Sequence, residues 1–190
     1  MGADLYINKL FKANSEVHRP AFEAAVAERD ACKQQVDACG QKYVCARKPH
    51  TRKKWLAKQD EWRVKQAAAQ EIVSQEYDAM HDVGYFRDSY NATDLLWVLG
   101  LSWWGNVTPM LNKAGNLRGD KLLEFREMVA KRRVPTTARL AAYLEKQHAC
   151  VDDGENSVAE WRKFFTEKRK RLLAFLDEAI RLKAPVVCSL

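Results

Sequence analysis

The sequence has few of the residues that break regular structure and no long apolar run. Its 190 residues include only eight glycines and five prolines, too few for a collagen-like chain or for an all-β chain with many tight turns. No apolar run approaches the roughly 20 residues that span a bilayer, so we expect no membrane insertion. The first ten residues lack a basic stretch followed by an apolar block, so no secretory signal is visible and we predict a cytoplasmic protein.

The short motifs of common enzyme classes are also missing. There is no glycine-rich phosphate loop, no Gly-x-Ser-x-Gly elbow, no His-Glu-x-x-His pair and no calcium-binding loop. A catalytic group of His81, Arg87 and Asp88 is a minor alternative, because a histidine and a carboxylate seven positions apart often occur by chance. We therefore predict a protein that is not an enzyme, with no catalytic residue and no cofactor.

Five cysteines, an odd number without a Cys-x-x-Cys pair, argue against a disulfide framework. The spacing of one group resembles the three-cysteine, one-histidine zinc finger that binds single-stranded RNA; this group is Cys32, Cys39, Cys45 and His50. The surrounding pattern is helical and would hold Cys32 and Cys39 about 10.5 Å apart along the helix axis. Zinc–sulfur bonds are about 2.3 Å long. We predict no metal site and expect small core side chains here, with zinc as the open alternative.

Apolar residues recur at helical spacing along most of the chain. In the N-terminal half, Pro20 is expected in the first turn of a helix that ends near Gly40. A second helix is expected from Arg52 to Val83, with Thr51 as its cap. The apolar stripe of this second helix consists of Trp55, Trp62, Ala69, Val73 and Met80.

In the C-terminal half, the boundaries of the expected helices are clearer. Ser157 and Glu160 form a capping box that begins a long final helix, and Pro185 follows its end. Two shorter helices have apolar faces made of Leu122, Phe125 and Val129 and of Leu140, Tyr143, Leu144 and His148. Only Leu5 to Ile7 resembles a strand. We predict an all-α fold in a single domain (1–190): an elongated helical bundle of five to seven helices, with two long antiparallel helices and a buried short central helix.

The segment 84–105 is unusually rich in aromatic residues. Large apolar residues fill eight of the twelve positions from Thr93 to Trp104 and cover every side of a helical wheel, which predicts an enclosed helix. The stretch before it, residues 85–91, is expected to be a loop, either a polar plug against the buried helix or a recognition site. We assign the candidate partner-binding site to Tyr85, Arg87, Asp88, Tyr90, Asn91, Trp103 and Trp104.

Parts of this segment also resemble other proteins. The stretches Gly-Tyr-Phe-Arg-Asp-Ser-Tyr-Asn and Leu-Gly-Leu-Ser-Trp-Trp, with the opening Met-Gly-Ala-Asp-Leu-Tyr-Ile, resemble segments of uncharacterised bacterial and phage proteins. The resemblance covers less than a fifth of the chain. It implies a bacterial or phage setting and carries no activity and no functional residue.

The chain is basic, with a net charge of +7 that favours acidic partners. The excess is concentrated in two basic clusters, 47–58 and 162–171. Positive charge at the start of a helix is disfavoured by the helix dipole, so the first cluster calls for an acidic partner, either the loop Asp152 to Glu155 or phosphates. The candidate nucleic-acid-binding residues are Arg47, Lys48, Arg52, Lys53, Lys54, Lys168, Arg169, Lys170 and Arg171.

These observations lead to a ranked set of functions. We predict first a non-enzymatic helical binding protein that acts through protein–protein interaction, with a protein partner or a second copy of the chain. Nucleic-acid binding through the basic clusters is the alternative. A small-molecule-binding or metal-dependent enzyme is the third.

Overall fold

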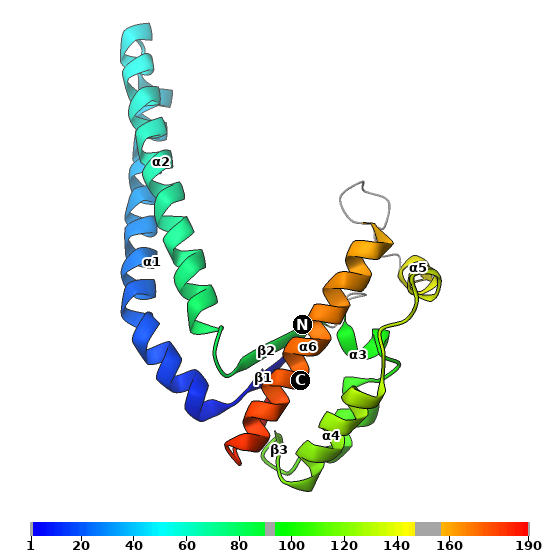
Figure 1. Ribbon diagram of the computed structural model, residues 1–190. Coiled ribbons are helices and arrows are strands. Elements are labelled where there is room, and N and C mark those ends of the chain that lie inside the picture. The colour runs from blue at the N-terminus through cyan, green and yellow to red at the C-terminus, as the bar shows by residue number, and fades with distance from the viewer. Residues whose placement is uncertain (1, 90–93, 147–156, 190) are drawn as a thin grey trace. The chain divides into compact units, whose positions relative to one another are not determined.

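The computed structural model describes residues 2–89, 94–146 and 157–189. The chain is mostly helical, as predicted, and its two long helices, α1 (Asn8–Cys45) and α2 (Pro49–Met80), pack closely (Figure 1). The chain divides into two compact units: unit 1 comprises Met1–Phe11 and Gly84–Leu190, and unit 2 comprises Lys12–Val83. Within the ranges described, no helix combines the length and apolar character needed to cross a bilayer.

Unit 2 is a hairpin of two antiparallel helices, most of α1 and all of α2. Three contacts between α1 and α2 fit a single antiparallel register, in which the numbers of the two contacting residues sum to 94 or 95. These contacts join Ser15 to Met80, His18 to Glu76 and Val36 to Gln59. In the second of these, the His18 ring and the Glu76 carboxylate lie 2.9 Å apart. Because this sum hardly changes, the two helices stay in the same register over 22 residues of α1.

Small residues line the α1 side of this hairpin. Ala25, Cys32 and Cys39 are buried and recur every seven residues, which returns them to one face of the helix. In the register above, Cys32 lies level with Trp62 and Cys39 with Trp55. A small side chain opposite a tryptophan lets the two helices approach each other. The predicted stripe of α2 is confirmed, with its last three members buried.

The predicted boundaries of both long helices are wrong. Helix α1 begins at Asn8 and contains Pro20 in its interior, because one missing N–H group does not end a helix that is continued on both sides. Gly40 also lies inside α1. A Cβ atom there would stand 2.9 Å from Nε2 of Gln59, which donates to the carbonyl of Val36, so this glycine makes room for α2. Helix α2 begins at Pro49, a first-turn proline, and not after Thr51.

Unit 1 contains a four-stranded antiparallel sheet that the sequence analysis missed apart from its first strand. The strands are β1 (Gly2–Tyr6), β2 (Tyr85–Ser89), β3 (Asn116–Leu117) and β4 (Val186–Ser189), in the order β2-β1-β4-β3. They are two to five residues long, too short for an alternating pattern to stand out. They also come from distant parts of the chain, so no hairpin turn in the sequence indicates where they lie.

Three helices build the rest of unit 1. They are α4 (Asp120–Lys131), α5 (Thr137–Lys146) and α6 (Val158–Arg181). Helix α6 packs against α4, α5 and β2 and occupies the centre of this unit (Figure 1). Its capping box is present as predicted, since Glu160 N–H donates to Ser157 Oγ and Ser157 N–H donates to the Glu160 carboxylate. The predicted apolar face of α4 is buried, as are Leu140 and Leu144 of the α5 face; Tyr143 is partly buried, and His148 lies outside the described residues.

The buried short central helix is confirmed, but it is shorter than predicted. Helix α3 (Leu95–Val98) is followed by a turn at Gly100, where φ is +69°, and then by the π-helical turn η1 (Trp103–Val107) and the 3-10 turn η2 (Thr108–Met110). A positive φ is easily adopted only by glycine and cannot continue a right-handed helix. The chain therefore turns in the middle of the aromatic segment, and its side chains do not follow one helical wheel.

Replacing Gly84 by alanine should destabilise unit 1 strongly. Gly84 has φ +71°, and a Cβ atom there would stand 2.7 Å from both Leu10 Cβ and the backbone nitrogen of Phe11. We expect a loss of more than about 2 kcal/mol in the free energy of unfolding, measured by urea denaturation, because backbone strain and a clash add together. Gly115→Ala is the matched control. It has φ +73° but only an ordinary contact at 3.6 Å, so it should lose about half as much. Equal losses would contradict the role given to the clash.

Candidate functional site

The predicted loop at 85–91 is, over its described residues, an edge strand. Strand β2 pairs antiparallel with β1 in a register that places Tyr85 opposite Tyr6 and Arg87 opposite Asp4. Because side chains alternate along a strand, Asp88 points into the core while Tyr85 and Arg87 lie on the other face. Of the proposed partner-binding residues, Asp88 therefore lies on one face of β2, and Tyr85 and Arg87 lie on the opposite face. Tyr90 and Asn91 lie outside the described residues.

Asp88 is the centre of a buried polar network. Its carboxylate is fully buried and forms an ion pair with Nζ of Lys168 on α6, at 2.5 Å. It accepts hydrogen bonds from the backbone N–H of Leu95 at 2.9 Å and of Leu96 at 3.3 Å, at the start of α3. It also accepts one from the indole Nε1 of Trp103, at 3.1 Å. One side chain therefore ties strand β2 to α3, η1 and α6.

A second buried carboxyl group, Asp94, lies beside the first and caps α3. Its Oδ1 accepts from the N–H of Leu96 at 2.8 Å, while no donor within the described chain reaches its Oδ2. Burial, together with the hydrogen bond and negative charge of Asp88, raises the pKa of Asp94 to about 9. Asp94 is therefore protonated at neutral pH and shares a hydrogen bond with the Asp88 carboxylate.

The two carboxyl groups titrate as a pair with opposite shifts. Burial alone would raise the pKa of Asp88, but the hydrogen bond from Asp94 and the charge of Lys168 outweigh it and lower that pKa. The network therefore holds one negative and one positive charge at neutral pH. Tyr143 on α5 responds to the same groups, since burial and the nearby carboxyl groups raise its pKa.

This arrangement fits the polar plug and gives no support to a catalytic group. The Asp88 carboxylate is used by four donors and by Asp94, and it is not exposed. Arg87, on the opposite face of the same strand, cannot act with it on one substrate atom. The plug was one of the two interpretations of this segment, and the buried contacts of Asp88 are what it requires.

The outward face of β1 and β2 carries a small aromatic and ionic cluster. The Tyr85 hydroxyl donates to Asp4 Oδ1 at 2.6 Å, and Arg87 Nε lies 3.7 Å from the same oxygen. Burial and the hydrogen bond to Asp4 raise the pKa of Tyr85. The Tyr6 ring lies 5.0 Å from that of Phe11 and 5.2 Å from that of Tyr85, measured between centroids. This cluster stabilises the edge of the sheet.

The tryptophans of the aromatic segment are divided between the core and the surface. Trp103 is buried and bound to Asp88, so it does not belong to an exposed surface as the sequence analysis supposed. Trp104 is 62% exposed and Trp97 is 53% exposed. We name these two side chains the indole surface. Trp97 was not among the residues predicted for the partner-binding site.

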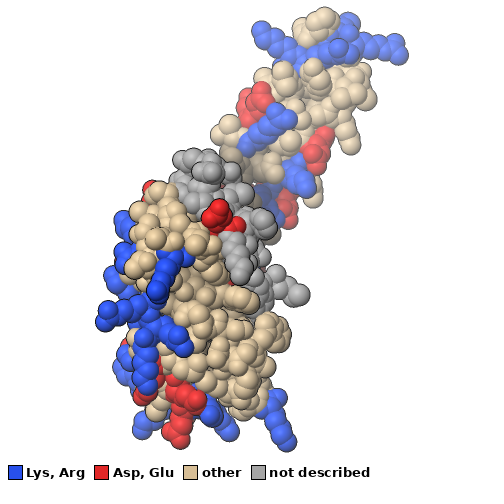
Figure 2. Space-filling view, turned by 90° about the vertical axis from the view of Figure 1, so that its right-hand side faces the viewer, with Lys and Arg blue, Asp and Glu red and all other residues tan. Residues whose placement is uncertain are grey.

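The first basic cluster lies at the tip of the hairpin in unit 2, where Figure 2 shows basic side chains gathered. Its exposed members are Arg47, Lys48, Arg52, Lys53 and Lys54. Arg52 donates to the backbone carbonyl of Ala46, and within the described residues none of the five forms an ion pair with a carboxylate. Trp55 lies among them, with the ammonium groups of Lys42 and Lys58 at 4.7 and 5.4 Å from its ring. The loop Asp152 to Glu155 lies outside the described residues.

The second basic cluster is not a continuous cationic surface. Lys168 is bound to Asp88 in the core. Arg169 donates to the backbone carbonyls of Val129 and Ala130 and so satisfies the C-terminal end of α4. Lys170 pairs with Glu167, at 2.7 Å. Of the four predicted residues, Lys170 and Arg171 are exposed, and the Arg171 side chain has no hydrogen bond or ion pair with another described residue.

The cysteine and histidine group of the zinc alternative follows the helix. Cys32 and Cys39 are buried two turns apart in α1, and Cys45 is exposed at its end. Over the described ranges, no group of three or more histidine, cysteine, aspartate or glutamate side chains is placed to hold a metal ion. The buried cysteines act as the small core side chains that were expected.

Comparison with known proteins adds no functional residue. No family model, curated protein or solved structure matches this chain. The candidate sites therefore depend on the contacts described above.

Replacing Asp94 by asparagine should make unit 1 less sensitive to alkaline pH. The folded chain holds a proton on Asp94 that the unfolded chain releases above about pH 4, so this group makes the protein less stable as the pH rises towards 9. An asparagine amide donates to Asp88 at every pH. We expect Asp94→Asn to match the wild type near pH 5 and to have the higher free energy of unfolding at pH 8 to 9, measured by denaturant titration.

The neighbouring substitution Asp88→Asn is the control for this experiment. It leaves Lys168 buried without its ion pair, which costs about 3 to 5 kcal/mol. A wild-type stability that rises between pH 5 and pH 9, or an Asp94→Asn difference that does not change with pH, would contradict the protonated state of Asp94.

Proposed function

We propose that this chain is a non-enzymatic binding protein that recognises a protein partner through the indole surface, Trp97 and Trp104. One observation carries the proposal: both indoles are more than half exposed, although the other large apolar side chains between residues 95 and 103 are buried. Tryptophan is enriched among the residues that dominate binding energy at protein interfaces. A partner that covers the indoles removes a large apolar area from water.

The size of the effect can be estimated from area. A tryptophan side chain buries up to about 200 Å², so covering the exposed half of each ring removes about 100 Å². At about 25 cal/mol per Å² this stabilises a complex by roughly 2.5 kcal/mol per indole before ordering costs. Those costs are low here, because Trp104 follows Trp103, which is bound to Asp88, and Trp97 lies in a helix whose N-terminus is bound to the same group.

The proposed setting is the cytoplasm of a bacterium, or of a bacterium infected by a phage. Cys32, Cys39, Cys45 and Cys188 are free, and an exposed free thiol such as Cys45 suits a reducing compartment. The partner is another protein or a second copy of this chain.

The double substitution Trp97→Ala and Trp104→Ala should weaken partner binding at least tenfold and leave the thermal midpoint within about 2 °C, because neither side chain belongs to the core. Binding is measured by quantitative affinity capture from the native host, and self-association by sedimentation equilibrium. Val64→Ala, which trims another exposed apolar side chain, is the control for non-specific adhesion. Unchanged capture and unchanged self-association would refute the proposal, and a large fall in the midpoint would assign the indoles to the fold.

Nucleic-acid binding at the hairpin tip is a second candidate. The observation that favours it is a group of exposed cations around Trp55, a residue type that can stack on a base. Cations without carboxylate partners release bound counterions when they contact phosphates, so such binding weakens steeply with salt.

A salt titration tests this candidate. For a single-stranded oligonucleotide of about 30 residues, we expect the affinity to fall steeply between low and moderate salt. The double substitution Lys53→Gln and Lys54→Gln should reduce the slope of the logarithm of affinity against the logarithm of salt by about two. Arg171→Gln on α6 is the control, with no expected change in slope. Absent or flat binding at low salt would rule out the tip as a phosphate site.

A further inference from the structure

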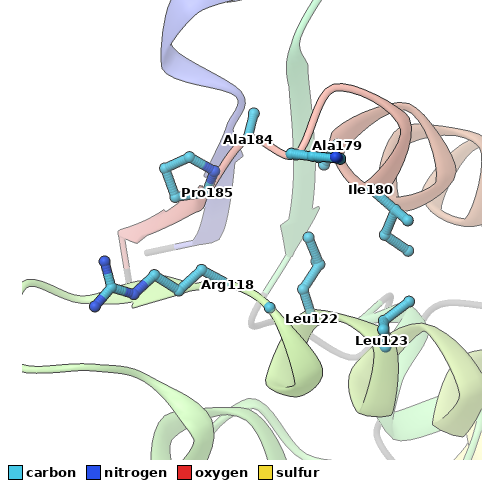
Figure 3. Close-up of a pocket in the computed structure, with 9 residues that line it drawn as sticks. Arg118, Leu122, Leu123, Ala179, Ile180, Ala184 and Pro185 are labelled. Carbon is cyan, nitrogen blue, oxygen red and sulfur yellow. The ribbon is translucent and has the colours of Figure 1, made fainter.

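A cavity of about 490 Å³ opens in unit 1 between the start of α4 and the end of α6 (Figure 3). Its apolar lining includes Leu122, Leu123, Ile180, Ala184 and Pro185. Figure 3 shows Leu122 rising from α4 towards α6 and Ile180 pointing down towards α4, so the side chains converge on a shared space. Pockets for small molecules have volumes of about 300 to 1,000 Å³ and mostly apolar walls with a few polar groups. This cavity, which we name the acyl groove, has both properties.

The polar groups of the acyl groove are both cations. Arg118 and Lys183 belong to its lining, and no acidic side chain does. Both side chains are exposed, and neither side chain forms a hydrogen bond or an ion pair within the described part of the chain. Figure 3 shows the Arg118 side chain extended below Pro185. Positive charge beside an apolar wall attracts anions more strongly than the same charge in open water.

The backbone at Lys183 gives a separate reason to look at this side chain. Lys183 has φ +50°, and the turn that it forms is closed by hydrogen bonds from Lys183 N–H to the carbonyl of Ile180 and from Ala184 N–H to that of Ala179. Helices commonly end in this way, and glycine is the preferred residue at the left-handed position. A lysine there is therefore less favourable than a glycine. What the lysine adds is an ammonium group beside the acyl groove.

We propose that the acyl groove binds a small apolar carboxylate of the fatty-acid type. The hydrocarbon chain lies against Leu122, Leu123 and Ile180, and the carboxylate lies at the mouth beside Arg118 and Lys183. Charge complementarity selects the occupant: an apolar wall alone accepts any apolar molecule, whereas two unpaired cations favour one that carries an anionic head. This site is independent of the indole surface.

The binding test uses octanoate, with three probes that each lack one feature of the ligand: octanol lacks the charge, octylammonium reverses it and inorganic phosphate lacks the chain. Binding is followed by displacement of the fluorescent apolar anion anilinonaphthalene sulfonate and by NMR shifts of the Leu123 and Ile180 methyl groups. We expect octanoate to bind at least tenfold more tightly than any of the three. Equal binding of octylammonium or octanol would overturn the proposal.

Two variants keep the test separate from folding. Glycine suits the backbone of position 183, so Lys183→Gly should bind octanoate at least tenfold more weakly while its thermal midpoint stays the same or rises. Leu123→Glu places a carboxylate on an exposed part of the wall and should abolish octanoate binding. Lys131→Gln, which removes a charge at the other end of α4, is the matched control and should bind as the wild type does.

The remaining outcomes also decide the matter. Unchanged binding by Lys183→Gly and Leu123→Glu would place the ligand elsewhere and overturn the proposal. Binding of an acidic peptide with apolar residues, without binding of octanoate, would overturn it in favour of a protein ligand.

Discussion

The ion pair between Asp88 and Lys168 is the interaction on which the rest of unit 1 depends. A carboxylate without solvent contact is costly unless it is paired and hydrogen-bonded, and Asp88 meets this requirement by drawing its partners from α3, η1 and α6. The neutral Asp94 provides one further donor and caps α3. The position of the short central helix, and with it the orientation of both exposed indoles, thus follows from the need to satisfy one buried charge.

Much of the helical fold was predictable because its signals are local. The residues of the capping box at Ser157, and those of the apolar faces of α4 and α5, lie within a few positions of each other, and the structure confirms these features. The sheet was not predictable, because its strands are short and their partners are distant in the sequence. The helix ends predicted at Pro20 and Gly40 are wrong for another reason, because packing between helices overrides the usual preference of these residues for helix ends.

The site residues show the same limit. Spacing along the sequence singled out the segment that contains Asp88 but could not show that Lys168, 80 residues later, neutralises it. The basic run 168–171 resembled a phosphate-binding patch in the sequence. On a helix, consecutive residues point in different directions, so the run divides into a core ion pair, a cap for α4 and two surface side chains. Exposed cations lie together at the hairpin tip and at the acyl groove, and these two places differ in chemistry, since one has a partly buried tryptophan ring and the other an apolar cavity.

The sheet order also bears on how the chain folds during synthesis. Strand β1 leaves the ribosome first, but it lies between β2 and β4, and β4 is made last. The hairpin of unit 2 involves only residues 12–83 and can form while translation continues, whereas β1 must wait with one edge open until residues 186–189 emerge. An exposed strand edge is prone to pair with other chains. Nascent chains that stall before β4 is complete are therefore the species most prone to aggregate.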